Sequence, residues 1–175
     1  MSLRIAALGL LAQHPGSGYD LLKRFEKSMA NVWPATQSQL YGELNKLADA
    51  GMIEVSDVGP RGRKEYRVTP AGRAELMRWV TNPQDDPPYR SALLLRVFLL
   101  GEIPPDQARE YMVSVAEHAD AELKRYEGLR DSIPWGDDDT DFYGRAGLEY
   151  GLRVEAMEGQ WARWLVEAID TRTRE

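Results

Sequence analysis

Three cationic side chains, Arg61, Arg63 and Lys64, lie within four consecutive residues of a turn-forming segment. The residues on either side of this turn alternate between apolar and polar types, which predicts a β-hairpin. A solvated hairpin turn needs only glycine and a polar residue, so cations clustered at its tip favour contact with phosphates or with the minor groove of DNA. Gly62, between two of the cations, belongs to the same candidate site.

The segment that precedes this hairpin carries the start and stop signals of a helix. Thr36 and Gln39 have the spacing of a capping box, in which a hydroxyl and an amide reciprocally satisfy free backbone donors of the first turn. Gly51 suits the left-handed conformation that ends many helices. These signals predict a helix over residues 36–50, whose leucines, spaced three or four residues apart, share one apolar face.

The opposite face of this predicted helix is polar, largely uncharged and able to form hydrogen bonds. Asparagine and glutamine can pair bidentately with adenine, lysine can contact guanine or phosphate, and glycine allows close approach. An ordinary solvated helix face has a similar composition, so the basic hairpin that follows is what favours contact with base edges. The candidate residues are Gln37, Ser38, Gln39, Tyr41, Gly42, Asn45 and Lys46.

The rest of the first half supplies the elements that would position these two groups. An apolar segment over residues 3–12 predicts a first helix. A second helix is predicted by an apolar stripe that begins at Tyr19 and repeats every three or four residues. Thr69 and Pro70 predict a capped start for a fourth helix. Three helices, the third capped and polar, followed by a basic hairpin form the layout of a winged helix-turn-helix.

At these positions the sequence resembles the PadR-type transcriptional regulators. The resemblance implies a DNA-binding winged helix in which residues 37–46 belong to the recognition helix and residues 61–64 to the wing. Members of the family usually have a proline where this sequence has Gly42, a departure that bears on base preference. The matching segments are GYDLL at residues 18–22, QLYGELNKLADAGMI at 39–53 and GRKEYRVTPAG at 62–72.

The charge of the chain is divided unevenly along its length. The 175 residues carry 22 Lys and Arg against 28 Asp and Glu, a net charge of −6, which alone argues against a polyanion binder. Residues 81–88 are rich in proline and predict a linker. Residues 1–80 hold 11 basic and 8 acidic residues, a net +3, and the remainder holds 11 and 20, a net −9. We therefore expect a DNA-binding domain over 1–80 and an α-helical dimerisation domain over 89–175, in a mainly α-helical protein.

Two long amphipathic helices are predicted after the linker. The last of them has apolar residues at alternating steps of four and three, a heptad pattern typical of helix pairing. A domain of this size does not readily cover two such faces, so we expect a second copy of the chain to do so. A weaker resemblance to the C-terminal region of one PadR subgroup implies the same arrangement. The predicted dimerisation residues are Tyr150, Val154, Met157, Trp161, Trp164 and Ala168.

Aromatic residues near this helix raise a second interpretation. Phe142, Tyr150, Trp161 and Trp164 could line a pocket for an aromatic or drug-like effector, which the family resemblance allows. Aromatic residues at helical spacing belong to a core more often than to a ligand site, so packing is the simpler interpretation.

Other classes of protein lack support in the sequence. The chain has no cysteine and two histidines, and it shows no nucleophile elbow, P-loop or paired acid and base, so we expect no enzyme and no cofactor. Asp137, Asp139 and Asp141 have the spacing of a calcium loop, but Phe142 replaces its glycine and Leu148 its glutamate, so we expect no metal. Without a signal peptide or an apolar span, we expect a cytoplasmic protein that does not bind membranes.

We therefore expect a homodimeric repressor that binds a palindromic site in double-stranded DNA. A small hydrophobic or aromatic effector could release the repressor from this site. The alternative is a protein-binding module on a winged-helix scaffold that has no contact with DNA.

Overall fold

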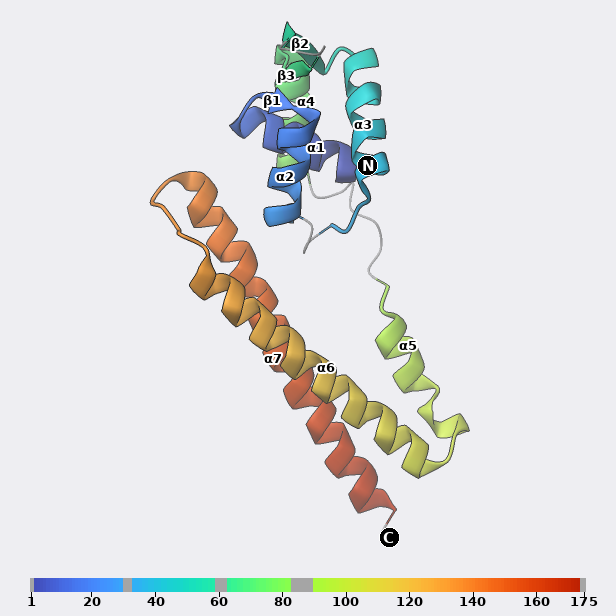
Figure 1. Cartoon of the computed structure of the whole chain (residues 1–175). Coiled ribbons are helices and arrows are strands. Elements are labelled where there is room, and N and C mark those ends of the chain that lie inside the picture. Colours follow the sequence, from blue (N-terminus) through green and yellow to red (C-terminus); the bar gives the residue numbers. More distant parts are fainter. Residues whose placement is uncertain (1, 30–32, 59–62, 83–89, 174–175) are drawn as a thin grey trace. The chain divides into compact units, whose positions relative to one another are not determined.

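The computed structural model describes residues 2–29, 33–58, 63–82 and 90–173 (Figure 1). Its contacts divide the chain into two compact units, residues 1–88 and 89–175, which we describe separately. The first unit contains α1 (Ser2–Gln13), β1 (Gly16–Ser17), α2 (Gly18–Lys27), α3 (Gln37–Asp49), β2 (Ile53–Val58), β3 (Lys64–Val68) and α4 (Pro70–Thr81). The second unit contains α5 (Ala92–Phe98), the 3-10 turn η4 (Leu100–Glu102), α6 (Pro105–Ser132) and α7 (Asp139–Arg172).

The core of the first unit lies among α1, α2 and α3. Leucines from all three helices are fully buried there, together with Phe25 of α2 and Ile53 of β2. The leucines of α3, spaced as the sequence predicted, are at most 1% exposed, so the apolar face of this helix is confirmed as its inward face. Burial of one α3 face against α1 and α2 leaves the opposite face outside.

The predicted helix ends are confirmed. The Thr36 hydroxyl accepts a hydrogen bond from the Gln39 N–H, and the Gln39 side chain accepts one from the Thr36 N–H. Gly51 has a φ of 67°, the left-handed conformation that ends α3. Thr69 caps α4, and Pro70 is its first residue. Thr81, expected to begin the linker, is the last residue of α4.

A small sheet accompanies the helices, with the antiparallel strand order β1-β3-β2. The hairpin of β2 and β3 was predicted, and its register pairs Ile53 with Val68 and Val58 with Lys64. The strand β1 was not predicted; it pairs Ser17 with Glu65 of β3. The second strand of the wing is therefore bonded on both sides, and its start is held close to the start of α2.

The second unit is built on the long helices α6 and α7, which pack along each other (Figure 1). Met112 of α6 and Ala162 of α7 are fully buried at their contact, and α5 adds partly buried apolar residues. Gly159 of α7 lies close to Ala119 of α6, because a Cβ added to Gly159 would stand 3.5 Å from the Ala119 Cβ. Small residues thus allow the two helices to approach closely.

The heptad predicted for pairing lies mostly away from this contact. The α7 face turned to α6 carries Leu152, Gly159 and Ala162, all buried. Tyr150, Met157 and Trp164 are 72%, 58% and 60% exposed. Of the other heptad members, Val154 and Ala168 are half-buried, and Trp161 packs partly against the apolar cluster of its own chain.

The acidic segment before α7 acts as a helix start. The Asp138 carboxylate accepts a hydrogen bond from the Asp141 N–H at 2.8 Å, and Asp139 and Asp141 lie in the first turn. Among the described residues, no three metal-ligating side chains gather in one place. None of the helices in the described ranges has an apolar run long enough to cross a bilayer.

Candidate nucleic-acid interface

The outer face of α3 has the exposure that the sequence predicted. Six of its seven candidate residues are exposed, and Gly42 is half-buried. A Cβ added to Gly42 would have no atom within 4 Å, so the helix surface there faces open space. The exposed six are Gln37, Ser38, Gln39, Tyr41, Asn45 and Lys46.

Two of these side chains already have intramolecular partners. The Gln39 amide oxygen accepts hydrogen bonds from the Thr36 N–H at 2.8 Å and from the Thr36 hydroxyl at 3.2 Å. Bidentate pairing with adenine needs both the oxygen and the nitrogen of an amide, so the cap competes with that role for Gln39. Lys46 pairs with Glu43 at 2.7 Å, yet its side chain is 69% exposed. Asn45 is thus better suited than Gln39 to contact a base edge.

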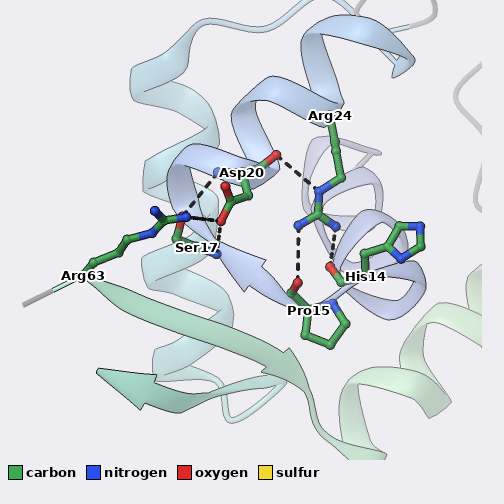
Figure 2. Close-up of polar contacts among 6 residues, drawn as sticks. All are labelled: His14, Pro15, Ser17, Asp20, Arg24 and Arg63. Carbon is green, nitrogen blue, oxygen red and sulfur yellow. Dashed lines mark hydrogen bonds and ion pairs between the residues drawn. The ribbon is translucent and has the colours of Figure 1, made fainter. Parts of the chain in front are cut away.

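The two described cations of the candidate wing site, Arg63 and Lys64, lie where β3 begins, at the turn end of the hairpin. Arg61 and Gly62 lie outside the described residues. Lys64 begins β3 and is exposed. The Arg63 guanidinium donates to the carboxylate of Asp20 in α2 (Figure 2), a partner that the sequence analysis did not foresee.

Asp20 is the centre of a small polar network. One of its carboxylate oxygens accepts hydrogen bonds from the Ser17 N–H at 3.0 Å, the Ser17 hydroxyl at 2.7 Å and Arg63. The Ser17 hydroxyl in turn accepts from the Asp20 N–H, which completes a capping box at the start of α2. The hydrogen bonds from Ser17 and Arg63 lower the pKa of Asp20 to about 2. The hydrogen bond to the Asp20 carboxylate, together with its charge, raises the pKa of Arg63. The network is therefore ionised across the physiological range.

Arg24 lies one turn after Asp20 in the same helix. Its guanidinium points to the end of α1 and donates to the carbonyl oxygens of His14 and Pro15 (Figure 2). It also donates to the carbonyl oxygen of Leu10. The carbonyl oxygens of His14 and Pro15, which follow the last turn of α1, thus receive hydrogen bonds from a charged donor. The Ser17-x-x-Asp20 spacing was a usable signal for the start of α2, but nothing in the sequence linked either residue to the wing.

A shallow hollow of about 290 Å³ lies where α2, α3 and the wing meet. One of its lining residues, Tyr19, was predicted to belong to the apolar stripe of the second helix, and this prediction was wrong. The Tyr19 side chain is 57% exposed, whereas Leu21 of the same helix is fully buried. A hollow with phenol groups and cations suits a sugar-phosphate backbone. Its lining consists of Ser17, Gly18, Tyr19, Tyr41, Arg63, Lys64 and Tyr66.

The aromatic residues proposed to hold an effector do not enclose a pocket within one chain. Phe142, Tyr150 and Trp164 are each at least 60% exposed. Phe142 packs edge-on against Tyr143, with ring centroids 5.1 Å apart. A pocket formed by these rings would need walls from a second copy.

A helix-turn-helix with an exposed polar third helix and a three-stranded wing defines the class of winged-helix regulators. Residues 7–78 match the model of the transcriptional regulator PadR-like family, and residues 89–170 match the model named virulence activator alpha C-term. A Mycobacterium tuberculosis protein named "Probable transcriptional regulator Rv1176c" is 30% identical over 185 residues, covering 97% of this chain and 98% of that protein. The chain therefore belongs to the PadR-like family of transcriptional regulators.

Solved structures agree with this assignment. The negative transcriptional regulator PadR of Bacillus subtilis is 27% identical over 177 residues, covering 96% of this chain and 97% of that protein. Its crystal structures in complex with operator DNA and with p-coumaric acid match with TM-scores of 0.82 and 0.84, at 26% and 27% identity, each covering 97% of this chain and 99% of that one. The relatives are regulators, so this chain is a transcriptional regulator and not an enzyme.

Proposed function

We propose that this protein is a homodimeric, sequence-specific DNA-binding repressor that acts on a palindromic operator in the cytoplasm. The observation that carries the proposal is the exposed polar face of α3, which lies beside the cations at the start of β3 in one unit. The Bacillus subtilis relative, named a negative regulator and solved with operator DNA, supports the same role here.

The proposed interface divides into base-reading and backbone-binding groups. Ser38, Asn45 and the open surface at Gly42 would face base edges in the major groove. Lys46, Lys64 and Tyr41 would contact the sugar-phosphate backbone, and their contacts fix the register of the helix without reading sequence. The full proposed set is Gln37, Ser38, Gln39, Tyr41, Gly42, Asn45, Lys46, Arg61, Gly62 and Lys64, while Arg63, on the same surface, is already paired with Asp20.

The proposed dimer is supported by the exposed side of α7. Tyr150, Met157 and Trp164 recur every seven residues and are more than half exposed, so they form a stripe along one side of that helix. Burial of such large side chains against a second copy is favourable, at about 1.5–3 kcal/mol for each fully buried one. Two reading helices held about 34–36 Å apart could then read the two halves of a palindrome.

The proposed effector is a small aromatic acid or a similar apolar molecule. The complex of the Bacillus subtilis relative with p-coumaric acid supports this chemistry. In this chain the rings of Phe142, Tyr150, Trp161 and Trp164 would provide stacking surfaces once a second copy encloses them. A thermal-shift titration with p-coumaric acid tests the idea, and an unchanged Tm over the full titration would exclude that acid.

The experiment that tests the function is a gel shift with the promoter region beside the protein's own gene. We expect retention that depends on sequence and weakens steeply with salt, because phosphate contacts release counterions. Asn45→Ala should mainly change the preference among sites, and Lys64→Ala should weaken specific and random DNA alike. Retention that is equal on both kinds of DNA, or absent, would overturn the proposal.

A further inference from the structure

The wing is tied to the start of α2 where β3 begins, by an ion pair between Arg63 and Asp20, which are far apart in the sequence. We propose that Asp20 is a positioning residue that holds Arg63, and through it the start of β3, so that Lys64 is presented to the DNA backbone. Arg63 is then an anchor of the wing and not a phosphate ligand. This inference rests on the proposed DNA-binding function.

The Asp20 carboxylate is itself held in place. Ser17, which donates two hydrogen bonds to it at 2.7 and 3.0 Å, is only 2% exposed. Ser17 also belongs to β1 and pairs with Glu65 of β3. The start of α2 is thus joined to the start of β3 twice, by a backbone strand at Glu65 and by a side-chain ion pair at Arg63.

The position of the ion pair makes competition with DNA unfavourable. To reach a phosphate, Arg63 would have to leave a charge-assisted hydrogen bond, which is among the stronger polar contacts in proteins. Its departure would also leave the Asp20 carboxylate uncompensated beside a polyanion. A carboxylate at this place repels DNA by its charge alone, so a loss of affinity when that charge is removed would come from lost positioning, of the wing or of the capped start of α2, and not from a lost DNA contact.

The DNA arm of the test compares two charge-removing changes on the same helix. Asp20→Asn keeps an oxygen that can accept from Ser17 and removes the charge that holds Arg63. The control, Glu26→Gln, also removes one negative charge from α2. Glu26 pairs with Lys23 at 3.2 Å, and each of the two side chains is 51% exposed, so the change breaks an ion pair of the same kind away from the wing. We expect Asp20→Asn to weaken operator binding about fivefold and Glu26→Gln to leave it unchanged or slightly tighter.

The opposite result has a distinct signature. If Arg63 is a phosphate ligand that Asp20 withholds, Asp20→Asn should tighten binding and steepen the salt dependence by about one phosphate contact. Tighter binding by Asp20→Asn than by Glu26→Gln would overturn the inference. Arg63→Lys, which keeps the cation, should retain more affinity than Arg63→Gln.

A second arm needs no DNA. Hydrogen exchange of the β3 backbone amides should be faster in Asp20→Asn and in Arg63→Gln than in Glu26→Gln, because the wing has lost one of its two ties. Unchanged exchange in both variants would overturn the anchor. If exchange rises while the unaltered protein binds no operator, the anchor stands and the proposed DNA-binding function fails. Should Asp20→Asn not fold, Arg63→Gln decides the same question.

Discussion

Tyr41 of α3 lies directly against Gly18, the first residue of α2. A Cβ added to Gly18 would stand 2.6 Å from the Tyr41 Cε1, closer than any normal contact. The absence of a side chain at Gly18 therefore determines where the phenol ring of Tyr41 can lie. Tyr41 is 36% exposed at the edge of the hollow between α2, α3 and the wing, so its orientation matters for what binds there.

Gly18→Ala should displace the Tyr41 ring and weaken operator binding several-fold, at a small cost in stability, because a partly exposed side chain can swing away. Gly72→Ala provides the contrast: its Cβ would meet the Met52 carbonyl oxygen at 2.1 Å, and backbone cannot move aside so easily. We expect an overpacking cost of about 1–3 kcal/mol there. Thermal unfolding and gel shifts measured on both variants check the distinction, which would be refuted by equal losses of stability.

Gly42→Ala should separate stability from binding. Since a Cβ at Gly42 would meet no atom within 4 Å, the helix should gain about 0.5–1 kcal/mol from the loss of glycine. If the outer face of α3 approaches base edges, the same methyl group should lower operator affinity. Gly9→Ala, also in a helix and in open space, is the matched control and should be stabilised without a change in binding. Full affinity in Gly42→Ala would contradict close approach at this position.

Met157→Glu should dissociate the proposed dimer. Met157 is 58% exposed in the stripe between Tyr150 and Trp164, and each copy would lose one buried side chain at a symmetric contact. We expect the dissociation constant to rise about a hundredfold, measured by sedimentation. Gln107→Glu, which adds the same charge at an exposed position of α6, should leave the assembly intact. A monomer in the unaltered protein at micromolar concentration would remove the basis for this test.

Glu155→Gln should stabilise the helical unit at neutral pH. Burial, with Glu158 and Glu122 nearby, raises the pKa of Glu155 above its ordinary 4.5, so the folded state holds this proton more tightly than the unfolded chain does. The unaltered protein should therefore gain stability from this group as the pH falls toward 4.5, and the advantage of the variant should shrink over the same range. Thermal unfolding at several pH values checks this, with the exposed Glu127→Gln as control.

The anchor between Asp20 and Arg63 should withstand all but strong acid. The pKa of Asp20 is lowered from 3.8 to about 2, so its contribution to stability is present above pH 3.8 and is lost as the pH falls through about 2. We expect β3 amide exchange to show no titration of this contact between pH 5 and pH 8 when rates are corrected for intrinsic exchange. A transition near neutral pH that Asp20→Asn abolishes would contradict this prediction.

The elements of the first unit could be predicted because their signals are local. The capping box of Thr36 and Gln39, the glycine at residue 51 and the Thr69-Pro70 pair each act within a few residues, so the sequence alone places α3 and α4. The inward leucines of α3 follow from helical spacing. The exposed polar face follows as the remainder of the same helix.

The parts that escaped prediction depend on contacts between distant residues. β1 is two residues long and has no strand pattern, and it exists because Ser17 meets Glu65. Arg63 was assigned to DNA because its sequence neighbours are cations, although its partner in the fold is Asp20, 43 positions away. The α7 side that meets α6 contains Gly159 and Ala162, which add little to an apolar pattern. The heptad pattern of larger apolar residues therefore lies mostly on the other side of the helix.

Arg24 holds the connection between α1 and α2 in place, and this limits which part of the first unit could be grafted onto another protein. Its guanidinium donates hydrogen bonds to the carbonyl oxygens of Leu10, His14 and Pro15, and the same helix carries Asp20 one turn earlier. A graft of α3 and the wing alone onto another scaffold would omit this connection. The wing would then lose its pairing with β1 and the partner of Arg63, Asp20. The smallest portable module of this regulator therefore includes α1, whose apolar residues belong to the same core, and begins well before the first residue expected to touch DNA.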